Sequence, residues 1–168
     1  MTRVQVSSRR GSAMVDFALT VIPLMFVIIS LTWMGIGMWQ YHTLAEAVNE
    51  TARYAALHGS DCVGQTCVTT LNEIATTLAG RAIGIPAHQI SVTLTSAAES
   101  YSSALLDSYY GNSTAWPSLA GNTAVTTNIS IKATYQFSSP ISMWVPGFGH
   151  WQFSAVTLGA SSTQPVLY

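Results

Sequence analysis

The 168-residue chain is long enough for one modest domain and a membrane anchor, and only 8% of its residues are charged, against roughly 25% in an ordinary soluble protein. The deficit is concentrated from Phe17 to Ala45, where no Asp, Glu, Lys or Arg occurs. No basic patch follows this run, so the composition gives no support to nucleic-acid binding through phosphate contacts.

The charges on the two sides of the apolar run differ in sign. Residues 1–16 contain Arg3, Arg9 and Arg10 against one acid, Asp16, whereas residues 46–168 contain three bases and six acids. Basic residues beside one end of an apolar span keep that end in the cytoplasm. The charge distribution therefore predicts a cytoplasmic N-terminus and a C-terminal domain on the far side of the membrane.

Residues 17–39 form the predicted membrane span. As a helix they would rise ~35 Å, enough to cross a hydrocarbon core of ~30 Å, so the lipid bilayer is the first predicted partner. Trp33 and Trp39 stand toward the outer end, where indole rings favour the headgroup level. Pro23 removes one backbone donor and predicts a bend, which membrane helices tolerate.

A cleavable secretory signal is an alternative interpretation of the same segment. The sequence Ala45-Glu46-Ala47 fits the small-x-small cleavage pattern, and removal there would release a soluble module that begins at Val48. However, the apolar run is longer than the usual core of a signal peptide, and the helical pattern does not stop at Ala47.

The helical pattern continues past the span to residue 58. Apolar residues recur every three or four positions, with polar residues on the opposite side, which predicts one helix over 12–58. A second helix is predicted from Val68 to Ile83, ended by Gly84 and Pro86.

Alternating apolar residues then predict three strands, at 90–95, 125–137 and 151–160, the last with a possible bulge near residues 155–156. The expected fold is α+β: a long N-terminal transmembrane helix continues into a small domain in which a second helix packs on a three-stranded antiparallel sheet. Residues 96–122 are predicted to be a long insertion, with a short helix at Glu99–Ser108. The apolar segment Pro140 to His150 is predicted to be a loop that caps the core or contacts a neighbouring subunit.

Two cysteines, Cys62 and Cys67, lie close together just after the first predicted helix. In an oxidising compartment such a pair favours a small disulfide loop. Free thiols are the alternative, and a metal site would need two further ligands that no nearby histidine pair offers. No metal or other cofactor is expected.

The segment at the cytoplasmic edge of the span, Arg9-Arg10-Gly11-Ser12-Ala13-Met14-Val15-Asp16-Phe17, places a glycine five residues before an acid–aromatic pair. With Pro23 inside the span and the continuing helix, it resembles the TadE-like family, pilin-like proteins of the tight-adherence (Tad/Flp, type IVc) pilus system. The resemblance covers roughly the first 58 residues.

This resemblance implies that a prepilin peptidase cuts between Gly11 and Ser12, which leaves Asp16 as the fifth residue of the mature chain. It implies residues 1–11 as a cytoplasmic leader, 12–58 as the transmembrane and extended helix, and 59–168 as an extracytoplasmic domain. Asp stands at position 16 where Glu is usual in the family. The implied role is that of a minor pilin or pseudopilin, because the major subunits are much shorter.

The expected location is therefore the bacterial inner membrane, with the domain in the periplasm, and the cell surface or pilus after assembly. The expected partners are the peptidase, other pilin subunits and the assembly platform of the inner membrane. The chemistry agrees with this interpretation, because the amine freed at Ser12 could pair with Asp16 of an adjacent subunit and offset the cost of a carboxylate at the membrane edge.

An enzyme is not expected. The four histidines are scattered, and neither a Gly-x-Ser-x-Gly elbow nor a phosphate-binding loop occurs. The alternative from another class is an envelope protein that stays anchored, is not cut, and binds a partner or serves as a scaffold.

Overall fold

The computed structural model describes residues 10–58, 69–97, 99–117, 127–138, 142–145, 149–152 and 155–166. The chain divides into two compact units, Met1–Ile36 and Gly37–Tyr168. The predicted first helix is confirmed as α1, Arg10–Leu57, which begins in the first unit and ends in the second. Cys62 and Cys67 lie outside the described residues, so their disulfide stays a prediction.

The second predicted helix is confirmed as α2, Leu71–Arg81, which is shorter than expected at both ends. It begins at a capping box: Thr70 Oγ1 accepts from the amide of Glu73 at 3.2 Å, and the Glu73 carboxylate accepts from the amide of Thr70 at 3.2 Å. Thr70 itself is extended, which is why the helix cannot start earlier. Beyond its end, Gly84 takes a positive φ of 84°.

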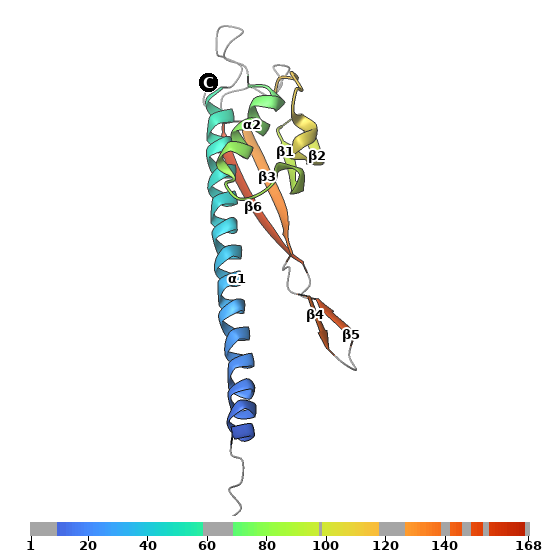
Figure 1. Ribbon diagram of the computed structural model, residues 1–168. Coiled ribbons are helices and arrows are strands. Elements are labelled where there is room, and N and C mark those ends of the chain that lie inside the picture. The colour runs from blue at the N-terminus through green and yellow to red at the C-terminus, as the bar shows by residue number, and fades with distance from the viewer. Residues whose placement is uncertain are drawn as a thin grey trace, which may run out of the picture. The chain divides into compact units, whose positions relative to one another are not determined.

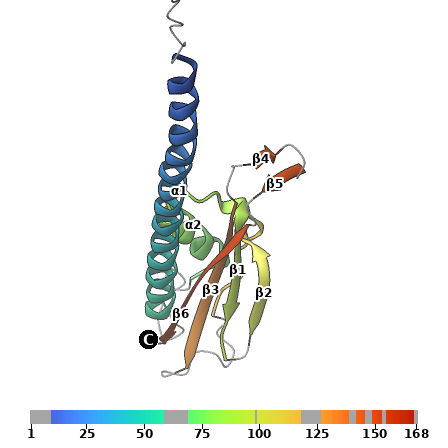
Figure 2. The same cartoon turned by 90° about the horizontal axis from the view of Figure 1, so that it is seen from below.

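A four-stranded antiparallel sheet forms the rest of the second unit, in the order β2-β1-β3-β6 (Figures 1 and 2). The strands are β1 Ile90–Thr95, β2 Ser100–Leu105, β3 Asn128–Phe137 and β6 Val156–Pro165. Two short 3-10 helices, η1 Ala87–Gln89 and η2 Leu106–Tyr109, precede β1 and follow β2. A separate hairpin joins β4 Ser142–Val145 to β5 Gly149–Gln152.

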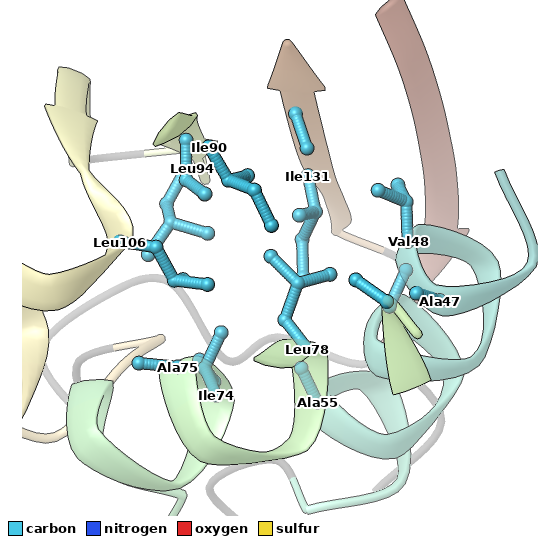
Figure 3. Close-up of a cluster of buried hydrophobic side chains, with 14 of the residues drawn as sticks. Ala47, Val48, Ala55, Ile74, Ala75, Leu78, Ile90, Leu94, Leu106 and Ile131 are labelled. Carbon is cyan, nitrogen blue, oxygen red and sulfur yellow. The ribbon is translucent and has the colours of Figure 1, made fainter. Parts of the chain in front are cut away.

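The core lies between one face of this sheet and the two helices. Alternate residues of β1 and β3 are buried, as the period-2 patterns predicted. Figure 3 shows Ile90, Leu94 and Ile131 directed toward Ile74 and Leu78 of α2. The C-terminal part of α1 contributes the other side of the cluster, with buried residues at helical spacing: Leu44, Ala47, Val48, Ala52 and Ala55.

The number of strands differs from the prediction, because the sheet has four strands rather than three. The extra strand is β2, which lies inside the expected insertion and occupies most of the segment predicted as a short helix at Glu99–Ser108, while the end of that segment is helical in η2. Only Tyr101 and Ala104 of this strand pack against the core, and its pairing with β1 is irregular between Val92 and Leu94. An edge strand with so few inward residues leaves a weak period-2 signal.

The prediction for the C-terminal segment is also corrected. Residues 142–145 and 149–152 form strands rather than part of a loop, and Met143 pairs with Trp151 across the hairpin. The third predicted strand, 151–160, is two elements, because β5 ends at Gln152 and β6 runs from Val156 to Pro165.

Polar contacts fix α1 against the rest of the second unit. Oδ1 of Asn49 accepts hydrogen bonds from Ser162 Oγ at 3.0 Å and from Gln164 Nε2 at 3.4 Å, both on β6. On the side of α2, the Arg81 guanidinium lies 2.7 Å from the Glu50 carboxylate. Both side chains of this ion pair are largely exposed, so it contributes at most about 1 kcal/mol.

Candidate assembly segment

The predicted cleavage and assembly residues all lie in the first turns of α1. Arg10 is the first helical residue, so Gly11 and Ser12 stand at the start of the helix, and Asp16 and Phe17 follow one turn later. Residues four apart lie on the same helix face, which places the backbone of Ser12 and the side chain of Asp16 on one side. Asp16 is exposed, and its carboxylate forms no ion pair with any residue that the structure describes.

Apolar side chains surround the segment that follows. Within the described residues, one helical stretch, Ala13–Leu57, is long and apolar enough to cross a membrane. None of the residues in its most apolar part is buried. Phe17, beside Asp16, is 67% exposed. The other large exposed apolar residues before Gly35 are Met14, Val15, Leu19, Ile22, Leu24, Met25, Phe26, Val27, Ile28, Ile29, Leu31 and Met34.

The few hydroxyl groups of this stretch are satisfied within the helix. Ser30 Oγ donates to the carbonyl of Phe26 at 2.8 Å, and Thr32 Oγ1 donates to that of Ile28 at 2.9 Å. Thr20 Oγ1 lies within hydrogen-bond distance of the Asp16 carbonyl, at 3.1 Å. Because these donors are already paired, they add little to the cost of placing the helix in lipid.

Pro23 lies inside α1, as expected, and borders a shallow apolar hollow on the helix surface. The hollow has a volume of about 540 Å³ and is lined by Met14, Val15, Ala18, Leu19, Ile22 and Pro23. Proline has no amide hydrogen, so the helix lacks one backbone hydrogen bond here. The first unit thus offers an open apolar surface directly beside the Asp16–Phe17 pair.

The second unit has a different hollow, of about 560 Å³, on the face of the sheet away from the helices. Its lining contains no charged residue and no histidine, so it offers no general acid or base: Gln89, Ser91, Leu105, Thr134, Gln136, Ser138, Ala155 and Thr157. Within the residues that the structure describes, no three His, Cys, Asp or Glu side chains gather as metal ligands.

Comparison with known protein families gives a match over residues 11–53, to the family described as TadE-like protein. Over these residues the chain is similar to TadE-like proteins. The match begins at Gly11, includes Asp16, Phe17 and Pro23, and ends at Arg53, inside α1. No curated protein and no solved structure matches the chain. The TadE-like segment therefore coincides with the long apolar helix, and together they support membrane anchoring and a pilin-like protein associated with the Tad pilus.

Sequence reasoning missed one set of residues that positions this helix. Gly37 lies against Phe137, and Trp39 lies against Gly84, so the part of α1 that follows the span is held by the sheet and by the turn after α2. A glycine after a helix was visible in the sequence, but its contact with a residue 45 positions away was not.

Proposed function

We propose that this chain is a minor pilin or pseudopilin of a Tad/Flp-type (type IVc) pilus, that a prepilin peptidase processes it, and that it takes part in pilus assembly and adhesion. The observation that carries the proposal is the coincidence of the TadE-like match with a helix whose apolar surface is uncovered from Ala13 onward. Its first matched residue, Gly11, is the residue after which the cut is proposed.

The position of Gly11 supports cleavage. It stands in the first turn of α1, where the amides have no intrahelical acceptor and the helix end frays easily. A glycine destabilises a helix by about 1 kcal/mol relative to alanine. Glycine also has no side chain that could obstruct a protease cleft. Local unwinding of Arg10 to Ser12 would therefore present an extended substrate at little cost.

Cleavage after Gly11 would create a positive amine at Ser12, one turn before Asp16. Two opposite unit charges ~4 Å apart gain about 4 kcal/mol at an effective dielectric of 20, before desolvation. The carboxylate of Asp16 is exposed and free to pair with the amine of a neighbouring subunit. Such a pair would set the axial step between subunits and offset the cost of an acid near the bilayer.

The apolar surface of α1 supplies the second part of assembly. In the membrane, the exposed side chains of this segment contact lipid tails, and in a filament they would contact the same segment of other subunits. Phe17 and the apolar hollow beside Pro23 are both open to such packing.

The second unit supports a minor rather than a major role, because a folded domain of this size exceeds what the short major subunits carry. Its proposed location is the periplasm and then the pilus tip or cell surface, where it would meet other pilin subunits, the assembly platform and adhesion targets. The oxidising periplasm also supports the disulfide between Cys62 and Cys67. The proposed role is structural and not enzymatic.

N-terminal sequencing of the protein recovered from cells with an active Tad system tests the cleavage. The expected first residue is Ser12. Recovery of Met1 would show an uncleaved anchored envelope protein, and Val48 would show a secreted module released from a signal peptide. Replacing Gly11 with Leu should leave the leader attached.

The assembly role is tested by the fraction of protein found in sheared pili. The variant Asp16→Ala should be cleaved normally but excluded from pili. Asp107→Ala is the matched control, because Asp107 is an exposed acid on η2, far along the chain from the span. Normal incorporation of Asp16→Ala would contradict the proposed pairing.

A further inference from the structure

Two contacts identify the end of the second unit at which α1 enters it from the apolar span. A Cβ atom on Gly37 would lie 3.5 Å from the ring of Phe137, at the end of β3. Trp39 packs on Gly84 in the same way, and Gln40 Nε2 donates to the carbonyl of Gly84 at 3.3 Å. We call this end the base, defined by Trp39, Ile83, Gly84, Phe137 and Val156.

The base exposes large apolar side chains. Ile83 is 64% exposed, Val156 56% and Trp39 51%, and Met38 beside Trp39 is also exposed. Elsewhere in the described part of the second unit most large apolar residues lie in one core, and the exposed exceptions are Tyr41, Leu57, Leu105 and Tyr110. A cluster of exposed apolar residues next to a membrane span is suited to a surface that is itself partly apolar.

The β4–β5 hairpin extends from this same end. Phe137, the last residue of β3, pairs with Val156, the first residue of β6, and the hairpin is the segment between them. Four residues separate Phe137 from β4 and three separate β5 from Val156, so β4 begins within ~18 Å of Phe137 and β5 ends within ~14 Å of Val156. Connectivity alone therefore holds it close to the membrane side of the sheet.

The composition of this region is typical of protein segments that lie at a membrane interface. No Asp, Glu, Lys or Arg occurs after Lys132, so the hairpin and both of its connections carry no such charge. The hairpin strands contain Met143, Trp144, Val145 and Trp151. Of the five tryptophans, Trp116 is buried in the core, and the other four lie at the outer end of the predicted span, the base or the hairpin.

We propose that the base and the β4–β5 hairpin together lie within the headgroup layer of the bilayer from which α1 emerges, so that both faces of the hairpin, one with Trp144 and the other with Trp151, are at that level. Tryptophan favours this level because its ring is apolar and its N–H still reaches water or a headgroup. A neighbouring subunit is a weaker candidate for this surface, because Trp39 of the base follows the span along the same helix and a single anchored copy already brings it to the membrane.

The proposal rests on the membrane anchoring in the proposed function, but neither on cleavage nor on entry into a filament. It can therefore be tested on the full, uncut chain. The protein is labelled with 5-fluorotryptophan and reconstituted as one copy per lipid nanodisc. Five fluorine resonances are expected, each assigned by one Trp→Phe variant, and headgroup-spin-labelled lipid is then added.

We expect the resonances of Trp39, Trp144 and Trp151 to lose intensity to the spin label, while that of Trp116 keeps it. Trp116 serves as the internal control, since it is fully buried in the core. If Trp39 loses intensity but Trp144 and Trp151 match Trp116, the hairpin is away from the membrane, and the inference is overturned while the anchoring stands. If Trp33 and Trp39 also keep their intensity, the chain is not inserted, and both proposals fail.

If a second copy of the chain, rather than lipid, contacts the base and the hairpin, the nanodisc experiment gives a different result. The Trp144 and Trp151 resonances would then shift when several copies share one disc and would not respond to the spin label in discs with one copy. That outcome also overturns contact with lipid.

Discussion

The indole of Trp39 occupies the space that a side chain at position 84 would need. A Cβ atom on Gly84 would lie 2.9 Å from Cζ3 of Trp39, and the backbone of Gly84 has a φ of 84°. This glycine is therefore required twice, once for a left-handed turn after α2 and once for the approach of the ring.

The first prediction concerns this contact. Gly84→Ala should lower the free energy of unfolding by about 1–2 kcal/mol from backbone strain, and by a further amount because the Trp39 ring must move. Gly111→Ala is the matched control, since Gly111 has a φ of 76° but no atom within 4 Å of its would-be Cβ. Denaturant unfolding in detergent micelles measures both, and equal losses would contradict the role of Trp39.

The second prediction concerns the hydrogen bonds between α1 and β6. Asn49→Ala and Ser162→Ala should each destabilise the protein by about 1 kcal/mol, and the double variant should lose less than the sum, because both changes remove the same 3.0 Å bond. Ser161→Ala, one position along β6 and exposed, should be neutral. Additive losses in thermal unfolding would show that the two residues act independently.

The third prediction concerns the start of α2. Thr70→Ala removes the acceptor of the Glu73 amide and should cost about 1 kcal/mol of stability. Thr76→Ala is its control, because the exposed Thr76 hydroxyl donates only to a carbonyl of its own helix. Circular dichroism during denaturation compares the two variants. An equal loss of stability in both would show that the capping box contributes no more than an ordinary hydroxyl group of the helix.

The fourth prediction concerns alkaline pH. Burial, and secondarily the nearby Tyr101, raise the pKa of Tyr109 above its ordinary value of 10.0. The unfolded chain then releases the phenolic proton at lower pH than the folded one, so stability is full below about pH 10 and falls as the pH rises further. Tyr109→Phe should flatten this decline in melting temperature. If the melting temperature of Tyr109→Phe declined as steeply as that of the wild type, ionisable groups other than Tyr109 would cause the decline.

The fifth prediction concerns the acid at position 16, where the family usually has Glu. Asp16→Glu should keep incorporation into pili, because the longer side chain still carries a charge that pairs with the amine of Ser12. Asp16→Asn should reduce incorporation as Asp16→Ala does. Immunoblots of sheared pili against whole cells give the ratio, and full incorporation of Asp16→Asn would show that charge is not required.

The elements with strong periodic patterns could be predicted from the sequence. The apolar face of α1, and the alternation in β1 and β3, each follow from residues that are neighbours along the chain. Asp16, Phe17 and Pro23 were identified through the resemblance to the TadE-like family, whose motif here lies within one helix.

The remaining features depend on contacts between distant residues. Strand β2 pairs with β1 through a sequence of which half is serine, and Tyr101 alone gives little indication of its inward face. The apolar segment Pro140 to His150 was predicted to be a loop, whereas residues 142–145 and 149–152 pair as the β4–β5 hairpin. The packing of Trp39 on Gly84 joins two segments whose local patterns are independent, so neither pattern could reveal it.

Strand β6 ends the described sheet, and its ten residues include no Asp, Glu, Lys or Arg. Charged side chains on such outer strands usually discourage unwanted pairing with other molecules. Without such charges, the protein depends on the membrane and its partners to prevent pairing of β6 with other copies. Overproduction beyond the capacity of the membrane should therefore yield β-rich deposits, which a lysine at the exposed position of Ser161 would reduce.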